Sequence, residues 1–341
     1  TTAPNNVAVG YNSLAVNTTG DQNVAVGSQA LDANTTAGNN VAVGYLALTN
    51  STTANRNTAV GSSAMAAATT GNENVAIGHD AGMEITTGDE NVAIGNLTLD
   101  ACTTGSDNTA VGARALGACT TGSENTAYGQ RALTNLTTAL YNTAIGYNAS
   151  RDLTTGNSNT TLGINAGLVL TTGTNNLILG TNSGRSTSPS GDITTGSNNV
   201  CLGDNSINNL FCADTSISSS DQRDKTDITD FTKGLDWIIA LRPVTYRWDR
   251  RTWYGTEEEP YGTPDGSKKR QRLHVGFLAQ EALAVEQANG YGHNNDDSLI
   301  LNLTEDGMSY GMKYERLVPV LVNAIKELSA EVEQLKSQLN N

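Results

Sequence analysis

The chain has 341 residues, enough for two or three domains, and its 34 acidic residues against 20 Lys plus Arg give a formal net charge of −14. An acidic chain lacks the basic footprint that phosphate binding needs, so nucleic acid is not an expected partner. No run of 18 apolar residues occurs and no signal peptide is recognisable, so membrane insertion is not expected either. No cofactor and no metal are predicted. The cysteines at 102, 119, 201 and 212 lack C-x-x-C spacing, which favours small apolar packing over a disulfide or a metal site.

The composition changes sharply near residue 215. Residues 1–219 hold five Arg, no Lys and 14 acidic residues, a net charge of −9, whereas residues 220–341 hold 15 basic and 20 acidic residues, a net charge of −5. The first 210 residues contain no Phe or Trp and only five Tyr. A core built from Val, Ile, Leu and Ala suits thin repeated layers better than one rounded core.

The clearest pattern is a glycine that closes an N-x-A-h-G motif, where h is apolar, every 17 residues. It occurs at positions 10, 27, 44, 61, 78, 95, 112, 129, 146, 163 and 180. A twelfth copy ends at Gly203, 23 residues on, because six extra residues at 187–192 lengthen that repeat. Thr-Thr-Gly or Thr-Thr-Ala follows most of these glycines after eight residues. A strict period with punctuating glycines predicts a solenoid.

Each repeat shows alternation that is typical of a short strand. The positions three and one before the glycine are mostly β-branched or apolar, as in Val7 and Val9, and the position between them is usually Ala. We expect the bulky residues to face the interior. A second segment, such as Ala30-Leu31, predicts a second strand in each coil. At roughly 4.8 Å per coil, the spacing between strands, the repeats would form a rod about 55 Å long.

Equivalent residues of successive repeats are expected to stack. Asn6, Asn23 and Asn40 fall in register, so their amides should form a ladder in which each amide donates to the next. Cys102 and Cys119 occupy equivalent positions in adjacent repeats and should lie close together.

The NVAVG and NTAIG cores resemble the head repeats of trimeric autotransporter adhesins of the YadA type. The resemblance covers roughly residues 1–207. It implies a parallel β-roll, left-handed in that family, with three chains side by side. The period here is longer than in that family, and the Thr-Thr-Gly joint is an addition.

The sequence beyond residue 216 follows an α+β pattern. In chain order the predicted elements are a helix at 231–241 ended by Pro243, a strand at 244–248, an exposed hairpin or loop at 250–272, a segment at 274–281 leading into a short helix, turns at 289–308, and a helix from Tyr314 to the end.

The last helix carries apolar residues at alternating spacings of four and three, namely Leu321, Ile325, Leu328, Val332, Leu335 and Leu339. This heptad seam predicts a trimeric coiled coil. One amphipathic helix packed on its own domain is the alternative.

Several separated motifs resemble the intramolecular chaperone domain of the endosialidase type, a self-cleaving peptidase at the end of phage tail spikes and fibres. They are Ser220-Asp221-Gln222-Arg223-Asp224-Lys225, Gly234-Leu235, Leu241-Arg242-Pro243-Val244, Gly276-Phe277-Leu278-Ala279-Gln280-Glu281, and Tyr314 before the coiled coil. The resemblance implies a virion tail fibre that trimerises while folding. It also implies that the chaperone domain is released in the host cytoplasm by cleavage before the motif serine.

The expected organisation is therefore mostly β. It comprises a parallel solenoid at 1–207, a linker at 208–219, an α+β chaperone and autopeptidase domain at 220–313, and a coiled-coil helix at 314–341. A serine hydroxyl needs a nearby base, and a desolvated neutral lysine can supply one. We expect Lys225 to take the proton of Ser220, whose oxygen attacks the carbonyl carbon of Ser219.

Four further residues are expected to support this cleavage. Asp221 or Arg223 would orient the peptide or stabilise the oxyanion, and His274 or Glu281 would position Lys225.

Two other functions stay open at this stage. One is a tailspike that degrades polysaccharide in upstream or inter-chain sites, although Asp21, Glu73, Asp80 and Glu84 lie at different phases of the repeat. The other is a bacterial surface adhesin, which would need a membrane anchor at its C-terminus. A host receptor or surface glycan is a possible partner in each case.

Overall fold

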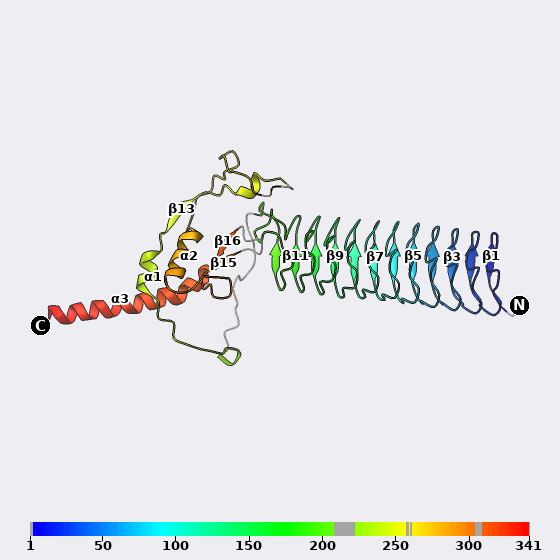
Figure 1. The fold of residues 1–341 in the computed structure, drawn as a ribbon, viewed down its shortest axis with the longest axis horizontal. Coiled ribbons are helices and arrows are strands. Elements are labelled where there is room, and N and C mark those ends of the chain that lie inside the picture. The colour runs from blue at the N-terminus through cyan, green and yellow to red at the C-terminus, as the bar shows by residue number, and fades with distance from the viewer. Residues whose placement is uncertain (1–2, 208–221, 257–258, 260, 304–308, 341) are drawn as a thin grey trace. The chain divides into compact units, whose positions relative to one another are not determined.

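The computed structural model describes residues 3–207, 222–256, 259, 261–303 and 309–340 (Figure 1). The chain divides into two compact units, Thr1–Ser206 and Ile207–Asn341. We describe each unit by itself.

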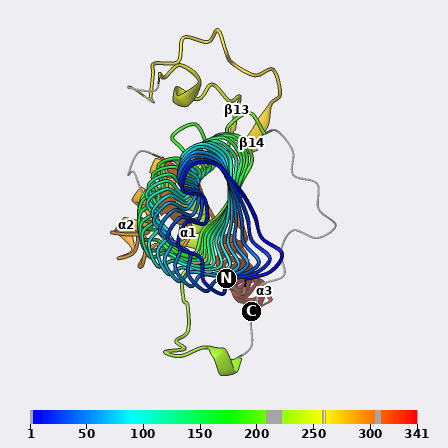
Figure 2. The same cartoon turned by 90° about the vertical axis from the view of Figure 1, so that its right-hand side faces the viewer.

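The first unit is a solenoid with one three-residue strand in each coil. The strands are β1 Val7–Val9, β2 Val24–Val26, β3 Val41–Val43, β4 Thr58–Val60, β5 Val75–Ile77, β6 Val92–Ile94, β7 Thr109–Val111, β8 Thr126–Tyr128, β9 Thr143–Ile145, β10 Thr160–Leu162, β11 Leu177–Leu179 and β12 Val200–Leu202. They form a single parallel sheet in sequence order, with equivalent residues of neighbouring coils opposite each other. Figure 2 shows the coils superposed end on, each slightly rotated from the last.

The prediction of two strands in each coil is wrong. The segment after the glycine is a tight turn, in which Leu31 adopts φ 51° and Leu48 adopts φ 53°. A left-handed residue breaks the extended backbone that a strand requires. The coil therefore closes on itself through turns opposite its only strand.

The prediction that the β-branched residues face the interior is also wrong. The central alanines of the strands, such as Ala25 and Ala42, are fully buried, whereas Val9 is 58% exposed and Ile77 is 40% exposed. The coil is so thin that the inner face of the sheet lies against the turn, where most coils hold only an alanine methyl group, although Thr161, Ile178 and Cys201 take the same position in the last three coils. Since strand residues alternate between faces, the larger side chains point outward.

The interior is filled by two further positions of the turn, four and seven residues after each glycine. Their sizes compensate in most coils, Leu133 with Leu136 being an exception. The buried pairs are Leu31 with Asn34, Leu48 with Ser51, Met65 with Ala68, Gly82 with Ile85, Leu99 with Cys102, Leu116 with Cys119, Leu133 with Leu136, Ser150 with Leu153, and Gly167 with Leu170. In most coils a large residue at one position is accompanied by a small one at the other, as close packing requires.

The pairing of a large residue with a small one explains why cysteines occur inside the solenoid. Cys102 and Cys119 are free and fully buried, and each is the small partner of a leucine. The prediction that they pack as small apolar residues in adjacent coils is confirmed. Cys201 is also free and buried, and Cys212 lies outside the described residues.

The predicted asparagine ladder is confirmed and runs through the core. The side-chain amide of Asn40 donates to Oδ1 of Asn23 at 3.2 Å, and the backbone N–H of Asn40 donates to the same oxygen at 3.0 Å. The amide also donates to the carbonyl oxygen of Ala54 in the next coil at 2.8 Å. Oδ1 of Asn40 in turn accepts from the backbone N–H of Asn57 at 2.9 Å, so this buried asparagine satisfies a carbonyl and an N–H group of the next coil.

The motif glycines are needed because successive coils approach closely. A Cβ atom on Gly61, at φ 144°, would lie 2.2 Å from the carbonyl oxygen of Gly78. No side chain fits there, and this backbone conformation is one that glycine adopts without strain.

The second unit is a small α+β domain. Its elements are η1 Gln222–Asp224, α1 Leu235–Ala240, β13 Val244–Tyr246, η2 Arg251–Trp253, β14 His274–Gly276, α2 Ala279–Ala288, β15 Leu301–Leu303, β16 Tyr310–Met312, η3 Tyr314–Arg316 and α3 Leu317–Leu339. The strands form two antiparallel pairs, β13 with β14 and β15 with β16.

These elements match the predicted order, with four differences. The first helix is shorter than predicted and begins at Leu235, the strand after it ends at Tyr246, and the last helix is preceded by a 3-10 turn. The strand pair β15 and β16 was not predicted, since only turns were expected at 289–308. The described part of 250–272 contains η2 and loop rather than a hairpin.

One face of helix α3 packs against its own domain, and another face is exposed. Leu317, Val320 and Ala324 are buried, and α1 packs against α3. The six residues of the heptad seam are between 41% and 86% exposed. The seam is therefore not packed on the described part of its own domain, and the trimeric coiled coil stays a prediction.

Candidate self-cleavage site

The predicted site is described only on one side of the cleavage bond. Ser219, Ser220 and Asp221 lie outside the described residues. Lys225 directly follows η1, and its backbone N–H donates to the carbonyl oxygen of Gln222 at 3.2 Å. Lys225 and Arg223 are both exposed. The pairing of Ser220 with Lys225 stays a prediction.

Glu281 forms an ion pair with Arg242. The guanidinium of Arg242 donates to Oε1 of Glu281 at 2.5 Å and to Oε2 at 3.1 Å, and the hydrogen bond with Glu281 raises the pKa of Arg242 above its ordinary value. Both side chains are exposed, so the pair contributes little to stability by itself. The ion pair links the first turn of α2, which holds Glu281, to the segment that follows α1, which holds Arg242. A role of Glu281 toward Lys225 stays a prediction.

His274 lies on β14 opposite Tyr246 of β13, and the two rings stack with centroids 5.5 Å apart. Trp248 packs edge-on against both rings, 5.1 Å from Tyr246 and 6.2 Å from His274. In this position His274 is part of an aromatic cluster on the two-stranded sheet, and its predicted role beside Lys225 is untested.

The Gly276-Phe277 motif packs against the start of the last helix. The backbone N–H of Phe277 donates to the hydroxyl of Tyr314 at 3.3 Å, and the two rings stack with centroids 6.1 Å apart. A Cβ atom on Gly276 would lie 2.6 Å from that hydroxyl. Gly276 is thus a glycine because the tyrosine occupies the space of a side chain.

Gly234 and Leu235 are positioned by polar residues of α3 that sequence reasoning did not single out. The backbone N–H of Leu235 donates to Glu327 at 2.7 Å, and the amide of Asn323 donates to the carbonyl oxygen of Phe231 at 2.6 Å. A Cβ atom on Gly234 would lie 2.5 Å from Glu327 Oε1. The only sign of this role in the sequence is that Asn323 and Glu327 lie outside the heptad seam of α3.

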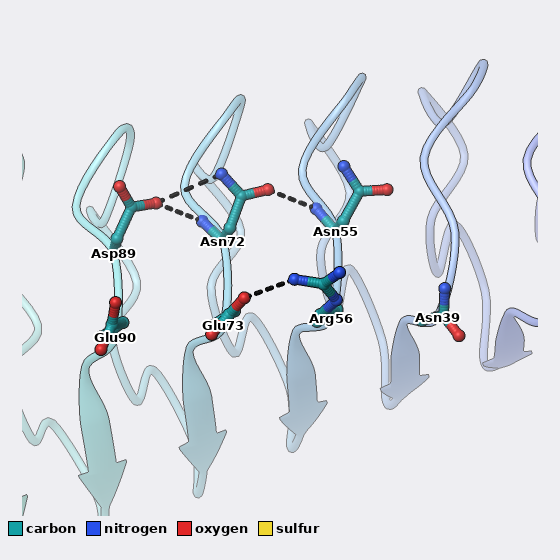
Figure 3. Close-up of a pocket in the computed structure, with 7 residues that line it drawn as sticks. All are labelled: Asn39, Asn55, Arg56, Asn72, Glu73, Asp89 and Glu90. Carbon is teal, nitrogen blue, oxygen red and sulfur yellow. Dashed lines mark hydrogen bonds and ion pairs between the residues drawn. The ribbon is translucent and has the colours of Figure 1, made fainter.

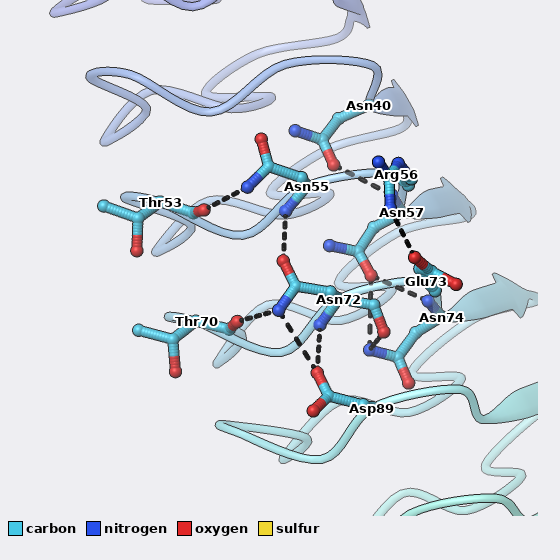
Figure 4. Close-up of polar contacts among 10 residues, drawn as sticks. All are labelled: Asn40, Thr53, Asn55, Arg56, Asn57, Thr70, Asn72, Glu73, Asn74 and Asp89. Atoms are coloured by element: carbon cyan, nitrogen blue, oxygen red, sulfur yellow. Dashed lines mark hydrogen bonds and ion pairs between the residues drawn. The ribbon is translucent and has the colours of Figure 1, made fainter.

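The solenoid surface has a hollow of about 400 Å³, formed by two columns of polar residues (Figure 3). Along the first, Asn72 Oδ1 accepts from the backbone N–H of Asn55 at 2.9 Å, and Asp89 Oδ1 accepts from that of Asn72 at 2.6 Å. Along the second, Arg56 donates to Glu73 at 2.6 Å (Figure 4). These contacts join neighbouring coils, so we interpret the hollow as structural.

The acidic residues are more regular than the sequence-based interpretation held. Glu73, Glu90, Asp107 and Glu124 are equivalent residues of four successive coils and are all exposed. Across the described residues, no three His, Cys, Asp or Glu side chains gather in a way that could hold a metal ion. No described helix combines the length and apolarity needed to cross a membrane.

Comparison with known proteins gives one match. Residues 220–291 match the family model of the peptidase S74 domain, described as the chaperone of endosialidase. No curated protein and no solved structure matches the chain. The C-terminal part is thus similar to an endosialidase chaperone, and a parallel β-solenoid precedes it, as in a tail fibre that carries repeats and a chaperone domain.

Proposed function

We propose that the chain is a segment of a homotrimeric viral tail fibre or adhesin. Its C-terminal domain drives trimeric folding and then cuts the chain between Ser219 and Ser220. The observation that carries the proposal is the family match, which begins at Ser220, after the solenoid in chain order.

A bare apolar seam on α3 supports the trimer. Leu321, Leu328 and Leu335 are 44%, 50% and 58% exposed in the single chain, although the helix buries another face in its own domain. Heptad positions of this kind are buried when parallel helices wind around each other. Three copies of α3 would cover all of these side chains.

The outer face of the solenoid sheet supports the same stoichiometry independently. Its outward residues directly before the motif glycines are apolar in every coil. Seven of them are exposed, namely Val9, Ile77, Ile94, Tyr128, Ile145, Leu162 and Leu202, and the other five are half-buried. A continuous exposed apolar strip marks an interaction surface. Three chains in parallel would bring three such strips together, and this would bury the residues that the thin coil cannot hold inside.

The cleavage follows from the chemistry of the two proposed residues. Lys225 takes the proton of the Ser220 hydroxyl, and the oxygen attacks the carbonyl carbon of Ser219. Collapse of the tetrahedral intermediate breaks the peptide bond as the proton passes from Lys225 to the departing Ser220 nitrogen, which leaves the acyl group as an ester on the Ser220 oxygen and frees the Ser220 amine. Water then hydrolyses the ester to a carboxylate on Ser219 and regenerates the hydroxyl.

Loss of the chaperone domain suits a solenoid trimer. To assemble, three chains must align their coils with one another. This alignment depends on contacts between chains and leaves strand edges unpaired until it is complete, so assembly is slow. A domain that trimerises first raises the local concentration of the other segments. Once this aid has been removed, an unfolded fibre cannot readily re-form, and its persistence is kinetic.

Intact mass and light scattering test the proposal. The wild-type protein should yield about 219 and about 122 residues, the second fragment beginning at Ser220. Ser220→Ala, Lys225→Ala and Lys225→Arg should each leave an uncut trimer, because arginine cannot act as the base. Lys269→Ala, which changes another exposed lysine, should cleave normally. Normal cleavage in Ser220→Ala, or a new N-terminus elsewhere, would remove Ser220 as the nucleophile.

A further inference from the structure

The second half of helix α3 lies beyond the contacts of its own domain, and Figure 1 shows it projecting past α1 and α2. The buried residues Leu317, Val320 and Ala324 all belong to the first half of the helix. Glu327 accepts from the backbone N–H of Leu235, and every residue from 328 to 340 is exposed. An apolar seam on an exposed helix marks a surface that another helix covers.

The seam shows which face of α3 meets a partner, but not how the helices are aligned. Its residues alternate between two heptad positions, namely Leu321, Leu328 and Leu335 at position d and Ile325, Val332 and Leu339 at position a. Since leucine recurs at every d position, sliding one helix by a heptad, about 10 Å, still places leucine beside leucine. An antiparallel pairing buries the same residues. The alignment is therefore decided by residues beside the seam.

The positions that flank the seam hold one acidic and one basic side chain. They are Val322, Ser329 and Lys336 at position e, and Ala324, Glu331 and Gln338 at position g. In parallel helices without stagger, a residue at g meets the e residue of the following heptad in the neighbouring helix. Glu331 and Lys336 stand in this relation to each other.

We infer that three copies of α3 join in parallel and without stagger, in a register set by ion pairs between Glu331 of each chain and Lys336 of its neighbour. The inference rests on the proposed trimer and adds its alignment. A shift by one heptad separates the two charges and, in one direction, brings Glu331 beside Ser329. In an antiparallel pairing, e meets e and g meets g, so Glu331 does not meet Lys336. One arrangement alone pairs the opposite charges.

Both side chains are exposed in the single chain, where the ion pair of Lys336 is a weak one. Its Nζ lies 2.7 Å from Oε1 of Glu333, and both of these side chains face solvent. A pair of this kind contributes little, and a lysine ammonium has three N–H donors. Lys336 can therefore bind Glu331 of the neighbour together with Glu333 or in its place. Beside a buried seam the new pair is less screened by water, so it is the stronger contact.

Disulfide crosslinking of the full chain tests the alignment. Leu335→Cys places a thiol in the seam, in a background of Ser220→Ala, which keeps the chain whole, and Cys212→Ser. The described cysteines, Cys102, Cys119 and Cys201, are buried. Helices that are parallel and unstaggered bring the introduced thiols together, so oxidised glutathione should link two chains of each trimer.

Light scattering reports the mass of the same sample. A monomer would refute the trimer itself, whereas a trimer that does not crosslink would refute only the alignment.

Charge reversal separates the ion pair from the seam. Glu331→Lys and Lys336→Glu should each slow crosslinking about tenfold, because every interface then holds two like charges, and the combined reversal should restore the rate. Glu333→Lys is the matched control, since it makes the same change of charge outside the e and g positions and removes the partner of Lys336 in the single chain. It should crosslink like its parent. Unchanged rates in the single reversals, no recovery in the combined one, or equal slowing in Glu333→Lys overturns the inference.

Discussion

The compensation of volume inside each coil can be tested by moving one coil's packing into another. In the coil that follows Gly78, Gly82 is paired with the large Ile85, whereas the next coil pairs Leu99 with Cys102. The backbone is the same in both, since φ is 57° at Gly82 and 51° at Leu99. Gly82→Leu combined with Ile85→Cys therefore copies the neighbouring coil, in which burial offsets the same left-handed strain at Leu99.

The single changes should each be costly. A Cβ atom on Gly82 would lie 2.8 Å from Cδ1 of Ile85 and 3.5 Å from Cγ of Met65, so Gly82→Leu overfills the coil and should cost about 2 kcal/mol. Ile85→Cys empties part of the core and should also cost about 2 kcal/mol. The double variant should lie within about 1 kcal/mol of wild type, which implies a coupling energy of about 3 kcal/mol.

The assay is guanidinium-induced unfolding followed by far-UV circular dichroism at matched protein concentration, with all variants in a Ser220→Ala background. Gly82→Leu combined with Leu170→Cys, a partner several coils away, is the control and should be additive. If the double variant at 82 and 85 is as unstable as the sum of its single variants, the argument from coil volume is wrong.

Four further outcomes are expected. Leu328→Lys places a charge in the three-helix seam, so light scattering should detect a mass below that of the trimer, and an intact trimer would contradict the seam. Asn91→Ala orphans the carbonyl oxygen of Gly105 and the backbone N–H of Asn108 in the next coil, so it should lower the free energy of unfolding by about 3 kcal/mol, far more than at an exposed asparagine. Gly276→Ala must displace Tyr314, so the near-UV signal of the second unit should weaken, and an unchanged spectrum would show that the tyrosine has room to move. A hydrogen bond with the neighbouring thiol and burial raise the pKa of Cys119, so its thiol stays protonated at pH 8. Iodoacetamide should therefore label Cys119 only after unfolding. Labelling of the native protein would show that the coil opens.

The sequence alone determined what depends on the period. Because every contact between coils joins residues one repeat apart, a 17-residue spacing fixes which residues stack, and the ladder through Asn23 and Asn40 could be predicted from it. The motifs of the second unit were likewise sufficient to predict the similarity to the chaperone of endosialidase over residues 220–291, and the heptad spacing identified the apolar residues that lie exposed along α3. All of these features depend on the spacing of residues along the chain, which the sequence shows directly.

The tertiary structure decided how each coil closes. Alternation shows that a strand has two faces, but not which of them turns inward. That depends on the width of the coil, and the coil is so narrow that Ala25 is inside and Val9 outside. The left-handed turn at Leu31 could not be predicted from the sequence either. A leucine adopts that conformation only when its burial offsets the backbone strain, and burial is a property of the tertiary structure. The partners of Gly234 and Leu235 lie some 90 residues away on α3, and only folding brings Glu327 to them.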